Sequence, residues 1–174
     1  ADWSETARTP EAAYALIDRA LLEFETQRPR PKSIQVPISV LRADAADFDA
    51  RFVPISNTPL PKAAVVEQSA DLLRRARRPI FIFGGGARSA AEPARTVLGL
   101  SSAATFTTYA GRGIVAGDPL HFGSYLANPE TASVFAKADL VIAVGTELAE
   151  VDFWRNHPGH DCACIHVDTD PAML

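Results

Sequence analysis

The stretch that decides the fold of this 174-residue chain is RRPIFIFGGGARSA, residues 77–90. Two arginines and a proline lead into four apolar residues, and three glycines and a run of small residues follow. A short, continuous apolar run is typical of a strand covered on both faces of a sheet. Glycines at its end permit a sharp turn into a helix, but beside a helix N-terminus they could also hold a phosphate. Both interpretations stay open from these residues alone.

The spacing of the glycines departs from the standard nucleotide-binding motifs. Position 89 is a serine, so the run is not G-x-G-x-x-G. The second strand, in TFTTYAGRG, also lacks the acid that would hold a ribose. No G-K-[ST] follows the glycines, which excludes a P-loop. We therefore do not expect a standard NAD site.

Strand-like and helix-like patterns alternate around this stretch. Short apolar runs predict strands at residues 79–83, 103–108, 139–145 and 162–168. Helical spacing predicts helices over 62–76, directly after the glycines, and over 128–138. Asn128 would cap the last of these, with Pro129 in its first turn. This alternation predicts an α/β fold, a Rossmann-like open parallel sheet with helices on both faces.

A helix and a strand precede the sheet as an appendage. Apolar residues at helical spacing predict a helix over 10–26, with Thr9 as its N-cap and Pro10 in its first turn. Alternating apolar residues then predict a strand over 34–38. Pro37 has no N–H group to donate, so this strand is an edge strand or ends there.

The composition of the sequence changes between the appendage and the sheet. Residues 42–61 contain three prolines and scattered acids without a sustained period, which predicts a linker. We therefore expect three parts, which are residues 1–41, the linker 42–61 and the sheet domain 62–174.

Polar and glycine residues follow two further strands. Gly145, Thr146 and Glu147 come after one, and Asp168 and Asp170 after another. Ligands of open parallel sheets bind outside the carboxyl ends of the strands, where an acid could hold a ribose hydroxyl. Asp170 and the proline after it could equally start a turn.

Composition and charge limit the class of protein. An apolar fraction of 47%, a charged fraction of 22% and a net charge of −4 suit a globular chain and argue against a nucleic-acid or membrane partner. No apolar stretch approaches about 18 residues. Two cysteines are too few for a disulfide scaffold, which favours a cytoplasmic location. A start without methionine and a stop just after an apparent strand predict a piece of a longer protein.

One segment carries residues that could bind a metal: His157, His160, Cys162, Cys164 and His166. Alternate residues of a strand share a face, so a metal site is conceivable. Zinc ligands, however, usually come from two knuckles or helix turns. The pattern favours buried thiols and loop histidines, and we predict no metal site. No nucleophile arrangement stands out, and no catalytic residue is predicted.

Four segments together resemble the central domain of thiamine-diphosphate-dependent enzymes, the family of acetolactate synthases, pyruvate oxidases and 2-oxo acid decarboxylases. They are ARRPIFIFGGGAR, TTYAGRGIVAGDPLHFG, ADLVIAVGTEL and IHVDTDP, in this order and at similar spacing. The resemblance covers about residues 60–174. Upstream, EAAYALIDRALLEFETQRPRPKSIQVPISV resembles the last helix and strand of the family's pyrimidine-binding domain, which would make residues 1–41 the C-terminal end of that domain.

The resemblance implies thiamine diphosphate and Mg²⁺ in the full-length enzyme, but not in this chain. The family's activating glutamate lies early in the pyrimidine-binding domain, and its G-D-G…N motif lies in a C-terminal domain. The one Gly-Asp pair here, Gly117-Asp118, is followed by proline. We expect the chain to be inactive alone.

Central domains of the family bind FAD, ADP or nothing. The positions that match the family's nucleotide contacts are Gly84, Gly85, Gly86, Ala87, Thr107, Thr108, Gly145, Thr146, Asp168 and Asp170. Flavin-binding relatives commonly follow the third-strand glycine with a small residue, Arg-Phe and an acid, whereas Thr146-Glu147-Leu148 stands here. This departure favours a structural pocket over FAD, since a glutamate would repel a diphosphate.

The resemblance thus implies a fragment of a 2-oxo acid decarboxylase or carboligase. The complete enzyme would be a homodimer or homotetramer, and its cofactor would attack the 2-oxo carbon and accept the electrons left when carbon dioxide departs. VGTELAEVDFW looks more like the decarboxylases of amino-acid-derived 2-oxo acids than like acetolactate synthases. The alternative is a free-standing FAD- or ADP-binding module of the same fold without decarboxylase chemistry.

Overall fold

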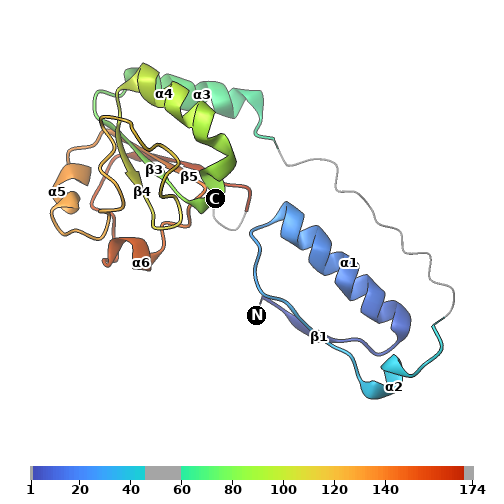
Figure 1. The fold of residues 1–174 in the computed structure, drawn as a ribbon. Coiled ribbons are helices and arrows are strands. Elements are labelled where there is room, and N and C mark those ends of the chain that lie inside the picture. The colour runs from blue at the N-terminus through green and yellow to red at the C-terminus, as the bar shows by residue number, and fades with distance from the viewer. Residues whose placement is uncertain (1, 46–59, 171–174) are drawn as a thin grey trace. The chain divides into compact units, whose positions relative to one another are not determined.

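The computed structural model describes residues 2–45 and 60–170. The chain divides into two compact units, the first built mainly from Ala1–Leu60 and the second from Pro61–Asp168. Most of the predicted linker, residues 46–59, lies outside the described residues. The two units are treated separately below (Figure 1).

The first unit is a strand–helix–strand motif followed by a short helix. Its elements are β1 (Ser4–Thr6), α1 (Pro10–Thr26), β2 (Ser33–Gln35) and α2 (Ile38–Leu41). The two strands pair in parallel, with Ser4 opposite Ser33. The predicted helix over 10–26 is confirmed, and Thr9 caps it by accepting a hydrogen bond from the Ala12 N–H at 3.2 Å.

The strand predicted over 34–38 is shorter than that range and ends before Pro37, close to the end that Pro37 was expected to cause. It stops at Gln35, and Ile38 begins α2 instead. Pro37 has no N–H group to continue a ladder and lies at the N-cap of that helix, which explains the early end. The pairing partner β1 was not predicted, because three exposed polar residues carry no apolar pattern.

The second unit is a parallel sheet with helices on both faces. Its elements are α3 (Ala63–Arg75), β3 (Pro79–Phe83), the 3₁₀ helix η1 (Gly85–Ala90), α4 (Ala91–Ser101), β4 (Ala104–Thr107), α5 (Thr131–Phe135), β5 (Leu140–Val144), α6 (Glu150–Phe153) and β6 (Ala163–Val167). The four strands lie in the order β4-β3-β5-β6, all parallel. This confirms the predicted fold class.

Two apolar layers cover the sheet. On one face α3 and α4 pack through Leu73 and Leu98 against Phe81. On the other, Phe135 and Phe153 of α5 and α6 pack against the remaining strand residues. Figure 1 shows the two helix pairs on opposite sides of the strands. Because β3 and β5 are central in this order, their side chains are buried almost throughout, as a continuous apolar run predicts.

One predicted helix is much shorter than expected. Helical spacing predicted residues 128–138, but α5 spans only Thr131–Phe135. The Oδ1 of Asn128 accepts a hydrogen bond from the Glu130 N–H at 3.0 Å, as expected of a cap, but residues 128–130 form a turn ahead of the helix. The helix therefore begins three residues later than predicted.

Asp139 connects the amino ends of the two central strands. Its carboxylate accepts hydrogen bonds from the backbone N–H groups of Arg77 at 2.7 Å and Arg78 at 2.8 Å, just before β3, while Asp139 itself leads into β5. Partial burial acts to raise the pKa of Asp139, but these hydrogen bonds together outweigh it and lower the pKa.

Candidate functional site

The carboxyl ends of the four strands gather most of the predicted site residues at one edge of the sheet. Gly84 follows β3, Thr108 follows β4, Gly145 follows β5 and Asp168 follows β6. Because the strands are parallel and in register, these four positions lie along the same edge. Asp170 groups with the first unit instead, so it is not described with this edge.

The backbone of the glycine stretch is bonded to its neighbours within the protein. The N–H of Gly84 donates to the carbonyl of Val144 at 2.9 Å, and the N–H of Gly86 donates to the carbonyl of Gly145 at 3.0 Å. The N–H of Ala87 donates back to the carbonyl of Gly84 at 3.1 Å. Three N–H groups that could have faced a phosphate are therefore already engaged.

The glycines are required by close approach of backbone to backbone. A Cβ atom at Gly84 would lie 2.2 Å from the carbonyl oxygen of Gly145 and 2.5 Å from the Cβ of Thr146. Gly145 has a φ of +60°, and a Cβ there would lie 2.5 Å from the nitrogen of Ala87. The turn after β3 and the turn after β5 are therefore in backbone contact, and neither tolerates a side chain at its glycine.

The loop after β4 also lies against the turn after β3. A Cβ atom at Gly111 would lie 2.1 Å from the carbonyl oxygen of Phe83, and that oxygen accepts the N–H of Thr108 at 3.0 Å. We call the contact of these three turns, residues 84–87, 108–111 and 145–146, the glycine crossing. Gly111 was not among the predicted site residues, although its place in the glycine-bearing loop was a usable signal.

The three threonines of the edge are also engaged within the protein. Thr107, Thr108 and Thr146 are all buried. The Thr108 Oγ1 accepts the N–H of Gly111 at 3.2 Å, and the Thr107 Oγ1 lies 3.1 Å from the Oγ of Ser124. These hydroxyls hold the long loop after β4 in place. Ser124 was not predicted as part of the edge, because its contact depends on how that loop folds back.

The turn after β5 contains a leucine in the left-handed backbone region, which residues other than glycine rarely adopt. The Thr146 Oγ1 accepts the N–H of Leu148 at 3.1 Å, and Leu148 has a φ of +51°. The ring Nε2 of His166 lies 2.7 Å from the carbonyl oxygen of Thr146, so this nitrogen carries the proton. His166 therefore fixes this turn from the neighbouring strand, a role that the sequence pattern did not predict.

At the glycine stretch, three backbone N–H groups that could bind the diphosphate of FAD or ADP are bonded within the protein. The N–H groups of Gly84, Gly86 and Ala87 are engaged, and the space over Gly84 is filled by the turn after β5. Two surface hollows of this unit, of about 510 and 390 Å³, are lined by none of the ten predicted residues. The role of those residues as cofactor contacts remains a prediction.

The histidine and cysteine residues before and within β6 are not gathered for metal binding. Among residues 2–45 and 60–170, no three His, Cys, Asp or Glu side chains lie close enough to hold a metal ion. The expected burial of the thiols is wrong in part, since Cys162 is half-buried and Cys164 is exposed. As an edge strand of the described sheet, β6 is covered less than β5. Burial still raises the pKa of both thiols.

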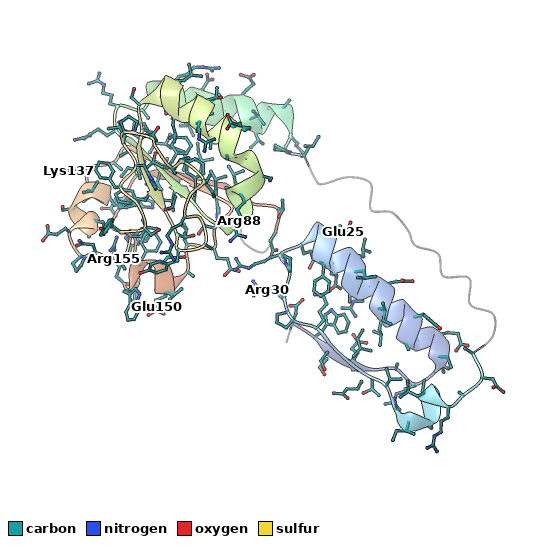
Figure 2. All side chains as sticks on the ribbon, in the orientation of Figure 1. Glu25, Arg30, Arg88, Lys137, Glu150 and Arg155 are labelled. Atoms are coloured by element: carbon teal, nitrogen blue, oxygen red, sulfur yellow. The ribbon has the colours of Figure 1, made fainter. Side chains whose placement is uncertain are left out.

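Arg155 is a half-buried residue that connects two segments and that the sequence analysis missed. Its guanidinium donates to the carbonyl oxygens of Leu126 and Pro158, both at 2.9 Å, and to the Thr131 Oγ1 at 3.1 Å. It thereby joins the turn before α5 to the loop after α6, and Figure 2 shows it near those two helices. Burial lowers the pKa of Arg155. Nothing in the sequence around an isolated arginine indicates such distant partners.

None of the described helices is long and apolar enough to cross a membrane. The described fold is thus a Rossmann-like parallel α/β domain joined to a strand–helix–strand unit, and its strand ends meet at a glycine-rich edge. Residues 66–174 match the family described as "Thiamine pyrophosphate enzyme, central domain". The chain belongs to this family.

Individual relatives agree with the family. The chain is 39% identical over 174 residues to the probable 2-ketoarginine decarboxylase AruI of Pseudomonas aeruginosa, with 99% of the chain and 31% of that protein covered. It is 32% identical over 153 residues to the acetolactate synthase isozyme 2 large subunit of Escherichia coli, with 84% of the chain and 28% of that protein covered. The chain thus spans about a third of the length of these relatives.

A solved structure shares the fold. It is an X-ray structure from Mycobacterium smegmatis ascribed to the thiamin diphosphate-dependent enzymes, with a TM-score of 0.72 and 19% sequence identity. The match covers 98% of this chain and 34% of that chain. At this identity the likeness shows the fold. The alternative of a free-standing FAD- or ADP-binding module finds no support in any of these comparisons.

Proposed function

We propose that this chain is the central part of a thiamine-diphosphate-dependent enzyme that decarboxylates or ligates 2-oxo acids, as a lyase or transferase. The observation that carries the proposal is the family match over residues 66–174, on a domain with the expected parallel sheet. The two relatives named for 2-ketoarginine decarboxylase and acetolactate synthase support a 2-oxo acid substrate. The higher identity to the first favours a 2-oxo acid derived from an amino acid.

The proposed role of the central domain is structural. Its glycine edge is closed by its own backbone, and its threonine hydroxyls are engaged in holding loops. No residue of the chain is proposed as catalytic. Thiamine diphosphate with Mg²⁺ would supply the electron sink for decarboxylation, and the motifs expected to hold them, which are an early glutamate and G-D-G…N, are not present in this sequence.

The domain assignment is part of the same proposal. Residues 1–41 would be the C-terminal end of a pyrimidine-binding domain, 42–61 a linker, and 62–174 the central domain. The parallel strands β1 and β2 with α1 between them suit the end of a larger parallel sheet, because a two-stranded sheet of this kind leaves apolar helix residues such as Ile17 and Leu21 exposed.

Assembly and location complete the proposal. A homodimer or homotetramer of the complete enzyme would agree with its family. A cytoplasmic location is supported by the two cysteines, which are unpaired in the structure.

The proposal is tested by producing the chain with the rest of its reading frame and assaying carbon dioxide release. A panel of 2-oxo acids would include 2-ketoarginine and pyruvate, each with and without thiamine diphosphate and Mg²⁺. We expect turnover that depends on the cofactor, with 2-ketoarginine preferred, and no turnover by the 174-residue chain. Turnover without the cofactor, or none on any 2-oxo acid, would contradict the proposal.

A further inference from the structure

A hollow of about 390 Å³ lies at the amino ends of the strands, at the opposite edge of the sheet from the glycine crossing. Several of its lining residues come from the start of β3, β4 and β5 or from just before them, among them Arg77, Ser102 and Lys137. Because these strands are parallel and in register, their amino ends lie together. We call this depression the amino-end hollow. It is separate from the carboxyl-end edge, where ligands of open parallel sheets usually bind.

The floor of the amino-end hollow belongs to the packed core. Ile80 lines the hollow but is only 3% exposed, and Ala104 and Ala138, which also line it, are half-buried and pack against the same core cluster. The floor is therefore closed and apolar, so a ligand would rest on the core without entering it.

The walls of the hollow are apolar and already in place. The N–H of Phe122 donates to the carbonyl oxygen of Thr105 at 2.8 Å, and the N–H of Thr105 donates to that of Leu120 at 2.9 Å, which holds this loop segment along β4. The ring of Phe122 stacks on the buried ring of Phe106 at a centroid distance of 5.6 Å and is still 51% exposed. Val134 of α5 also lines the hollow and is 41% exposed. An apolar ligand could therefore contact both Phe122 and Val134.

Three cationic side chains, Arg77, Arg78 and Lys137, line the hollow, and none of its described lining residues is acidic. Asp139 accepts the backbone N–H groups of Arg77 and Arg78, and the charge of Arg78 contributes to the lowered pKa of Asp139. Within residues 2–45 and 60–170, neither Arg77 nor Lys137 forms an ion pair. Figure 2 shows Lys137 beside α5. In a chain with a net charge of −4, this local excess of cations favours an anion.

We propose that the amino-end hollow binds a small carboxylate with an aromatic body. The carboxylate would lie between Arg77 and Lys137, because both side chains can donate charged hydrogen bonds to its oxygens. The body would lie on Phe122 and Val134, since a half-exposed ring can stack on an aromatic group. Glu130 lines the neighbouring hollow, which shares Phe122 and Val134, and would repel the carboxylate from that end. The charges therefore set one orientation of the ligand.

The proposed site goes beyond the thiamine chemistry and is tested without it, because binding is measured on the 174-residue chain and not by turnover. Exposed cations each contribute little, and a ligand of about ten heavy atoms gains little in a hollow open to solvent, so we expect a Kd of about 0.5 mM at low salt. Raising the NaCl concentration to about 0.5 M should weaken binding several-fold, since salt screens exposed charges.

Titration of the isotope-labelled chain with hydrocinnamate, followed by amide NMR spectra, tests the site. We expect saturable shifts at the amides of Ile80, Ala104 and Ala138, and none at Gly84 or Gly145, which lie at the other edge. Acetate has the charge without the body, and hydrocinnamyl alcohol has the body without the charge. Each should bind at least about tenfold more weakly than hydrocinnamate, because each loses one of the two contacts. No saturable shift with hydrocinnamate, or equal binding of the alcohol, would overturn the proposal.

The phosphate ester of hydrocinnamyl alcohol tests the class of anion. It carries the same body and more charge, so we expect it to bind within about tenfold of hydrocinnamate. Tighter binding than this would overturn the assignment to a carboxylate.

Variants that remove charge test the two cations. Arg77→Gln and Lys137→Gln should each weaken hydrocinnamate binding about threefold, and the double variant about tenfold. Lys137→Arg keeps the charge and should bind within about twofold of the parent. Arg112→Gln is the matched control, because Arg112 is an exposed arginine beside Gly111 at the opposite edge, and it should bind as the parent does. The same spectra show that each variant is folded. Equal binding by the parent and the double variant would overturn the proposal.

Discussion

At the scale of single residues, the contacts of the glycine crossing indicate the role of its glycines. Gly84, Gly111 and Gly145 are in contact with backbone atoms from another turn, not with open space. A glycine run after a buried strand could either bind a phosphate or allow two backbone segments to pack closely. Gly84 meets Gly145, and Gly111 meets Phe83, which are pairs far apart in the sequence, and these contacts favour the packing role.

Substituting one of these glycines should destabilise the domain. In Gly84→Ala the new methyl group would lie 2.2 Å from the carbonyl oxygen of Gly145. Relief requires the backbone to move, which we expect to cost about 2–3 kcal/mol. Urea unfolding of the chain, followed by circular dichroism, measures the change.

Gly99→Ala is the control for this experiment. Gly99 lies in α4, and a Cβ atom there would have no neighbour within 4 Å. Alanine in an exposed helix position should stabilise by about 0.5–1 kcal/mol. Equal effects of the two substitutions would contradict the role given to the crossing.

Glu23 should make the first unit sensitive to acid. Its carboxylate accepts hydrogen bonds from Lys32, Trp3 and Arg19, each at 2.8 Å. Chiefly the contact with Lys32 lowers the pKa of Glu23 from 4.5 to about 2. The folded pKa is the lower one, so the ionised carboxylate stabilises this unit fully above about pH 5, and that stabilisation is lost as the pH falls towards 2.

Fluorescence of Trp3 can report this loss in a Trp154→Phe background, because the chain has two tryptophans. The parent should show a transition between about pH 4.5 and 2. Glu23→Gln should lose most of that dependence, since an amide does not ionise. Glu25→Gln, on the same helix, is the control and should behave as the parent. A transition that survives in Glu23→Gln would assign it to another acid.

At the scale of elements, loops and short helices rely on side chains from distant segments. The turn before α5 and the loop after α6 have few backbone hydrogen bonds to each other, and Arg155 supplies the connection through Leu126, Thr131 and Pro158. An element of five residues would not hold its position by its own hydrogen bonds.

Arg155→Ala should therefore loosen this corner without unfolding the sheet. The partly buried carbonyl oxygens of Leu126 and Pro158 would lose a charged donor, at a cost of about 1–3 kcal/mol. Hydrogen exchange should quicken at Leu126–Thr131 and stay slow in β3 and β5. Arg112→Ala is the control, because Arg112 is exposed and bonds only within its own turn, to Tyr109. Exchange that quickens equally in the central strands would show a global role for Arg155.

At the scale of the whole molecule, the closed edge predicts that the chain does not bind flavin. Titration with FAD, followed by quenching of flavin fluorescence, should show no saturable binding up to about 100 µM, because the diphosphate would find its N–H donors engaged. ADP should behave in the same way by calorimetry. A known flavoprotein serves as the positive control. Stoichiometric FAD binding at micromolar concentration would show that the glycine edge opens for a ligand.

Much of the fold was predictable because its signals are local. The apolar run at β3 and the helical spacing at α1 each express burial of a short segment, and both were confirmed nearly to the residue. The gathering of strand ends at one edge followed from parallel order alone. The shortening of α5 was not predictable from periodicity, because the apolar spacing and the cap-type hydrogen bond of Asn128 are both present although residues 128–130 form a turn.

The sequence by itself determined the order of strands and helices, the parallel sheet and the family, since these depend on the period of apolar residues and on motifs in fixed order. Only the tertiary structure decided what the glycines do and how Arg155 and His166 hold the loops. The physical reason is that these features are contacts between residues that are far apart in the chain, whose distances the sequence does not contain.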